Sequence, residues 1–108
     1  MHVATTDRIP GHRIIEVLGV TQGIVVRAPT ISQGFTGSIE RVFGGNIQAY
    51  QTVCEAARKD AFERMIQNAR GLGANAVIGM RFDATEFSPG VTEVLAYGTA
   101  VMVVQIAS

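Results

Sequence analysis

The residue types most capable of chemistry in this chain are one cysteine and two histidines, Cys54, His2 and His12. Thiolate sulfur and imidazole nitrogen are the ligands that hold zinc, copper and other soft or borderline metals. Metal sites usually place such ligands at short sequence spacings, and none of these three has a partner at such a spacing. They are therefore weak candidates for metal ligands, although a symmetrical assembly could bring copies of one residue together.

Each of the three residues also has a structural interpretation, which we favour. Cys54 falls on the apolar stripe of a predicted helix, where a lone cysteine is usually a small buried hydrophobe. His2 is expected in a solvated terminus, and His12 is expected in a turn.

A second candidate site lies at Gly44, Gly45 and Asn46, which open a predicted helix. Free backbone N–H groups at a helix N-terminus can hold a small anion, and Tyr50, one turn further on, could line the same spot. We therefore treat these four residues as candidates for ligand binding or for a subunit interface. The structural alternative, which we favour, is a tight turn with an asparagine cap.

Acidic and nucleophilic side chains give no catalytic assignment. Asp83 and Glu86 lie near one strand end, and Asp83 shares a face with Arg81, so an ion pair is the simpler account. The serines form no Gly-x-Ser-x-Gly elbow. Gly71-x-Gly73 closes a helix, where the helix dipole has the wrong sign for a phosphate.

Length and composition predict a single domain over residues 1–108, copies of which associate with one another. Charged residues make up 17% of the chain, against about 25% in an average protein, so part of its surface is expected to be covered by further copies. The net charge of +0 and the lack of basic runs argue against nucleic acid and membrane partners. The single cysteine and the lack of a signal pattern or apolar span predict a cytoplasmic protein.

The first half of the chain predicts strands followed by a weak helix. Strand-like runs cover residues 13–18 and 20–27, with Gly19 and Gly23 marking bulges or close backbone approach. Residues 30–43 carry apolar side chains at helical spacing, but Gly34 and Gly37 make this helix marginal.

A long helix and a hairpin follow. From Asn46 as N-cap to Gly73 as C-cap, with Gly71 as a second C-cap candidate, an apolar stripe repeats every three or four residues. Its members are Ile47, Tyr50, Cys54, Ala57, Ala61, Met65, Ala69 and Leu72. The period then changes to two, and Pro89-Gly90 predicts a type II turn. The returning strand, residues 92–106, is apolar on both faces from Thr99 to Val104, which suggests burial against another subunit.

These elements predict an α+β fold. One long helix lies on one face of a mainly antiparallel sheet, which makes two layers, and the short marginal helix is added to them.

Several of these motifs resemble the YbjQ-like family of small bacterial and archaeal proteins. They are Thr5-Thr6, Gly19-Val20 with Gly23, Phe43-Gly44-Gly45 with Tyr50, Leu72 through Gly79, and Gly98-Thr99-Ala100-Val101. The resemblance implies a dodecin-like β-α-β-β subunit that forms a ring, expected to be a homopentamer. The family is labelled "putative heavy-metal-binding" and implies no particular activity. Its Gly-Gly is often followed by arginine, where this chain has Asn46.

Three hypotheses follow for function. The first is a non-enzymatic, cytoplasmic homo-oligomer, without an organic cofactor, that binds a small ligand or ion between subunits. The second is a heavy-metal-binding module, with His2, His12 and Cys54 as the available ligands. The third is an enzyme of unknown reaction.

Overall fold

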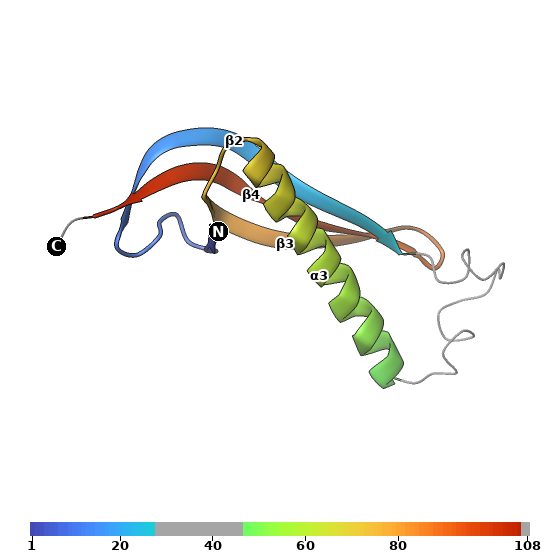
Figure 1. Cartoon of the computed structure of the whole chain (residues 1–108). Helices are drawn as coiled ribbons and strands as arrows, with labels where there is room; N and C mark the ends of the chain where they lie inside the picture. Colours follow the sequence, from blue (N-terminus) through green and yellow to red (C-terminus); the bar gives the residue numbers. More distant parts are fainter. Residues whose placement is uncertain (28–46, 107–108) are drawn as a thin grey trace.

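The computed structural model describes residues 1–27 and 47–106, which form one long helix and a four-stranded sheet (Figure 1). The strand order is β1-β3-β4-β2, with β1 parallel to β3 and both other pairs antiparallel. The elements are β1 (His2–Val3), β2 (His12–Arg27), α3 (Ile47–Gly71), β3 (Ala76–Ser88) and β4 (Val91–Gln105). The predicted α+β fold with one helix on one face is confirmed, whereas the marginal helix at 30–43 lies outside the described residues.

The hairpin of β3 and β4 forms the centre of the sheet. Ser88 pairs with Val91, so Pro89 and Gly90 alone make the turn. Gly90 has a φ of 75°, which is the conformation that a type II turn requires at its third residue. The predicted turn is therefore confirmed, and the strand that follows begins one residue earlier than expected.

Helix α3 packs mainly over β2 and β4 through small side chains. Ala57, Ala61, Met65 and Ala69 are buried at spacings of four residues, as the predicted stripe requires. The helix ends in a Schellman motif: the Ala74 N–H bonds to the Ala69 carbonyl at 3.1 Å, and the Gly73 N–H bonds to the Arg70 carbonyl at 2.9 Å. Gly73, with a φ of 90°, is therefore the left-handed residue after the helix, as predicted.

The two glycines of β2 have different roles. Gly19 lies at a register shift between Val17 and Gly19 and has a φ of 119°, so it belongs to a bulge. Gly23 lies under the helix, where a Cβ atom would stand 2.1 Å from the carbonyl oxygen of Ala61. The sequence allowed either role for each glycine, and the structure assigns one role to each.

The part of strand β4 from Ala100 to Val103 is covered on both sides within this one chain. Ala96 and Ala100 belong to the cluster under α3. Val101 and Val103 belong to a second cluster on the other side of the sheet, where Ile9 of the N-terminal segment covers them. The prediction that another subunit buries this stretch is therefore wrong for Val101 and Val103, because residues before β2 fold across them.

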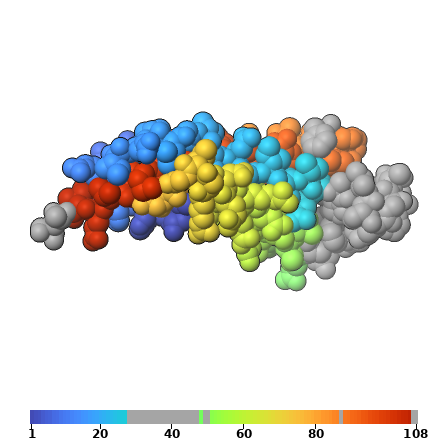
Figure 2. Space-filling view, turned by 45° about the horizontal axis from the view of Figure 1, so that its top comes forward, coloured from blue at the N-terminus to red at the C-terminus, as the bar shows by residue number. Residues whose placement is uncertain are grey.

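The molecule is elongated, and the first turns of α3 extend beyond the sheet (Figure 1). The Cα radius of gyration is 17.2 Å, whereas a compact domain of this length has about 13 Å. Figure 2 shows α3, coloured green to yellow, as a ridge on the molecule. No helix in the described ranges is both long and apolar enough to cross a bilayer.

The position of Cys54 corrects one prediction. The thiol is exposed, although the residue falls on the apolar stripe. Among the side chains of α3 that the structure describes, the first buried one is that of Ala57, because the helix has already diverged from the sheet before that turn.

Candidate metal site and exposed apolar surface

The N-terminal segment brings His2 and His12 together, although ten positions separate them. His2 lies in β1, next to β3, and His12 begins β2, on the opposite edge of the sheet. The link between them crosses the face of the sheet that α3 leaves free and buries Ile9 against Val101 and Val103. As a result, the two imidazole rings lie with their centroids 4.5 Å apart and their planes tilted by 52°.

The His12 ring is held in one orientation by its own turn. Residues Ile9 to His12 form a turn closed by a 3.1 Å hydrogen bond from the His12 N–H to the Ile9 carbonyl. The Nδ1 atom of His12 lies 2.9 Å from the Pro10 carbonyl oxygen. Because a carbonyl can only accept a hydrogen bond, Nδ1 is the donor in this contact, and in the neutral ring the lone pair then lies on Nε2. The predicted turn is present before His12, and His12 itself closes the turn and begins β2.

His2 lies in a short strand, where a solvated terminus was expected. Its backbone N–H donates to the Asn75 carbonyl at 3.2 Å, and the residue itself remains exposed. The third metal candidate, Cys54, lies on the part of α3 that extends away from the sheet. In the described ranges, no three side chains among histidine, cysteine, aspartate and glutamate converge as a metal would require. The structure therefore brings two of the three candidates together, and this pairing had no signal in the local sequence.

The acidic candidates make other contacts than those expected. Asp83 accepts a 2.9 Å hydrogen bond from the backbone N–H of Ala84. Arg81 donates instead to the carbonyl oxygens of Thr5 and Met80, each at 2.8 Å. The expected pair between Arg81 and Asp83 does not form, because the N-terminal segment offers Arg81 a carbonyl.

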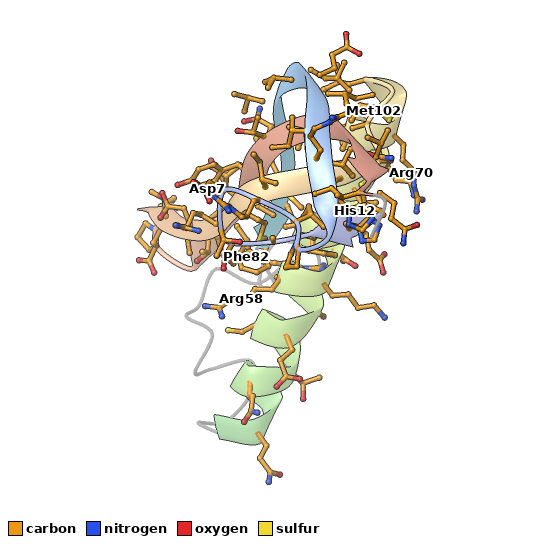
Figure 3. The ribbon with its side chains drawn as sticks, turned by 90° about the vertical axis from the view of Figure 1, so that its left-hand side faces the viewer. Asp7, His12, Arg58, Arg70, Phe82 and Met102 are labelled. Carbon is orange, nitrogen blue, oxygen red and sulfur yellow. The ribbon has the colours of Figure 1, made fainter. Side chains whose placement is uncertain are left out.

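A shallow groove beside α3 offers no convergent chemistry. Its charged lining residues have both signs, and the ion pair that Asp60 forms is with Arg27. Arg58, on the same helix, lies over the ring of Phe82 at 5.7 Å from its centroid (Figure 3). These contacts hold the helix to the sheet and form no ligand site.

The predicted anion site cannot be placed among these elements. Gly44, Gly45 and Asn46 lie outside the described residues, and so does the side chain of Tyr50, whose backbone belongs to α3. Their role stays a prediction.

The sheet has an exposed apolar surface on the side away from α3. Val25 and Val94 are buried under the helix, so their neighbours along each strand point to the other side. We call this surface the open face; it comprises Val20, Ile24 and Val26 of β2 with Leu95 and Tyr97 of β4. Val20 is 73% exposed, Val26 54% and Ile24 41%.

The glycine-containing junction after α3 is structural. The Gly79 N–H donates to the Thr6 carbonyl at 2.8 Å, and the Met80 N–H donates to the Ala4 carbonyl at 3.0 Å. Gly98 lies where a Cβ atom would stand 2.6 Å from a methyl of Val77. The motifs Thr5-Thr6, Leu72 to Gly79 and Gly98 therefore join the N-terminal segment to the hairpin.

Comparisons with known proteins give matches that cover almost the whole chain. Residues 1–104 match a family described as "Putative heavy-metal-binding". A UPF0145 protein of Burkholderia mallei (strain SAVP1) is 56% identical over 103 residues, which are 95% of this chain and 93% of that protein. A UPF0145 protein of Burkholderia thailandensis is 55% identical over the same shares of the two chains.

A solved structure shares the fold. It is a protein of unknown function from Pediococcus pentosaceus, assigned to the DUF74 family, with a TM-score of 0.64 and 17% identity. The match covers 96% of this chain and 98% of that one. At this identity the likeness concerns the architecture alone.

Proposed function

The chain belongs to the YbjQ-like family described as "Putative heavy-metal-binding", and from this premise we propose that it acts as a non-enzymatic homo-oligomer that binds a small ligand or ion between its subunits. The open face carries the proposal. Soluble monomers rarely expose contiguous apolar surface, and such surface usually marks an interaction site. Val20, Ile24 and Val26 are exposed and form such an apolar surface along one face of strand β2.

The edge position of β2 supports the same proposal. Among the described strands, β2 has β4 as its neighbour on one side and none on the other. It is 16 residues long. Long edges with unpaired N–H and C=O groups invite pairing with another chain unless they are blunted or covered. A further copy of the chain could cover both the edge and the apolar side chains beside it.

The shape of the subunit is a third support. The first turns of α3 stand clear of the sheet, and Cys54, Glu55 and Ala56 are exposed there. An amphipathic helix is stabilised mainly by packing of its apolar face, so this half of α3 would gain from a neighbouring subunit. The family resemblance implies a dodecin-like ring of five subunits. The single cysteine and neutral charge fit a cytoplasmic location.

Sedimentation equilibrium of the tag-free chain tests the proposal. We expect a single species at five times the 11.5 kDa mass of one chain, stable at micromolar concentration. A clean monomer at that concentration would overturn it. A single species at another whole-number multiple of that mass would change the number of subunits in the ring, but the proposed self-association would stand.

A second candidate function is metal binding, and the contact between the His2 and His12 rings favours it. Elemental analysis of the purified, tag-free chain, with and without added zinc or copper, tests this function. A ligand that binds only the native state must stabilise it, so the melting temperature should rise with added metal. The absence of both bound metal and a melting shift would count against it.

A further inference from the structure

We infer that His2 and His12 form a two-imidazole site for a borderline divalent cation, of the class of Cu²⁺, Ni²⁺ and Zn²⁺, with Nε2 of His12 as one of the ligands. The inference rests on the metal-binding candidate above and names the site and the class of ion. The family description names heavy metals in general and assigns no site. The fold supplies both residues from the N-terminal segment and the start of β2.

The distance between the rings suits a shared ion. Zinc–imidazole bonds are about 2.0–2.1 Å long, so two ligand nitrogens on one ion lie at most about 4 Å apart, and the ring centroids, which lie behind those nitrogens, are further apart than the nitrogens themselves. The ring centroids are 4.5 Å apart, and the planes are tilted instead of stacked. His2 is exposed, so its ring can rotate about its side-chain bonds to direct a nitrogen toward the ion while His12 stays in place.

His12 makes the same kind of hydrogen bond that metal-binding histidines make. A metal-binding histidine almost always donates its other ring N–H to a carboxylate, a backbone carbonyl or water, which fixes the tautomer and the direction of the free nitrogen. His12 already has this arrangement, since Nδ1 bonds to the Pro10 carbonyl. Nε2 is therefore available without any change in the turn.

The backbone on either side of the site is fixed. Ile9 is 6% exposed and anchors the crossing link in the cluster with Val101 and Val103. The Ile106 N–H donates to the Gly11 carbonyl at 2.9 Å, just before His12. On the other side, the Ala4 N–H donates to the Val77 carbonyl at 2.9 Å. The two ligands are thus held close before any ion binds, which lowers the conformational cost of binding.

The donor set determines the class of ion. Neutral imidazole favours copper, nickel and zinc, whereas magnesium and calcium favour oxygen ligands. Two protein ligands leave further coordination positions for water or for a small anion. We therefore expect an open, exchangeable site, weaker than a four-ligand structural zinc site.

Titration of CuSO4, ZnCl2 and MgCl2 into the tag-free full chain tests the inference. Isothermal calorimetry and elemental analysis after dialysis measure the stoichiometry and the affinity. We compare the wild-type chain with His2→Gln, His12→Gln and the double variant, and use Cys54→Ser as the matched control that removes the chain's single thiol. Circular dichroism establishes that each variant is folded.

We expect one Cu²⁺ or Zn²⁺ per chain, at least tenfold weaker binding in either histidine variant, and no change in Cys54→Ser. Substoichiometric Cu²⁺ should broaden the imidazole NMR signals of both histidines in the wild-type chain. Undiminished binding by the double variant would overturn the site but leave metal binding by the protein intact. No binding by the wild-type chain would overturn both, and equal binding of Mg²⁺ would overturn the assigned class of ion.

Discussion

The side-chain amide of Asn75 bonds to both backbone groups of Val103: Oδ1 accepts from the Val103 N–H at 2.8 Å, and Nδ2 donates to its carbonyl at 2.9 Å. Asn75 stands just before β3 begins at Ala76. Its side chain therefore acts as one more strand residue beside the end of β4. Val103 is only 3% exposed, so water cannot easily replace these two bonds.

Replacing Asn75 by alanine should lower the free energy of unfolding by about 2 kcal/mol, because the Val103 N–H loses its amide partner in a buried position. Urea denaturation measures the loss. Asn68→Ala is the matched control, since it removes an amide that bonds to the Gln22 carbonyl from an exposed position. Equal losses in the two variants would contradict the structural role of Asn75.

Replacing Gly23 by alanine should destabilise the chain by about 1–3 kcal/mol, the usual cost of overpacking a core. The added Cβ atom would meet backbone atoms of α3, the Ala61 oxygen at 2.1 Å and the Met65 nitrogen at 2.5 Å, and the helix would have to move away. Thermal unfolding with circular dichroism detects the change.

The control for Gly23 is Gly71→Ala, at the last residue of α3. A Cβ atom there meets nothing within 4 Å, and alanine is the better helix former by up to about 1 kcal/mol. This variant should be neutral or stabilised. A stable Gly23→Ala chain would show that the helix does not lie directly on β2.

Replacing Thr21 by valine should cost about 1 kcal/mol. The Thr21 hydroxyl is buried and donates a 2.8 Å hydrogen bond to the Met65 carbonyl, and valine keeps the shape of the side chain but removes the donor. Thr21→Ser keeps the hydroxyl and loses only a methyl group, so it separates the hydrogen bond from packing. The stabilities of the variants are compared through their urea midpoints, at an unchanged slope of the unfolding free energy against urea concentration. No loss in the valine variant would show that the bond has no net effect.

The double variant Val20→Asp with Ile24→Asp should shift the chain toward a monomer of 11.5 kDa, because the charges would have to be buried in a subunit interface. Light scattering coupled to size exclusion reports the mass. Gln67→Asp places the same charge on an exposed position of α3 and should leave the mass unchanged. An assembly that survives both aspartates does not use the open face.

The sequence predicts most of the architecture because two local patterns dominate it. The four-residue spacing from Ala57 to Ala69 and the change of period after Gly73 reflect which side chains face the core, and the structure confirms both. The Pro89-Gly90 turn is local as well. Such features depend on a few neighbouring residues, so they can be inferred without knowledge of the rest of the fold.

The errors come from contacts between distant segments. The link before β2 crosses the sheet, buries Val101 and Val103, and brings His2 to His12. No local spacing encodes that crossing. The prediction for Cys54 is wrong for a related reason, since the apolar stripe begins in the sequence before the helix reaches the sheet.

The pairing of β2 also affects the order in which the chain can fold. His12 pairs with Gln105 and Arg27 with Thr92, so a ribosome releases β2 long before it makes the strand that β2 needs. Contacts between segments so distant in the chain form slowly, because a long loop must close first. We expect the C-terminal hairpin, whose turn has two residues, to form early and serve as the template. The N-terminal half then joins it only after β4 has been synthesised.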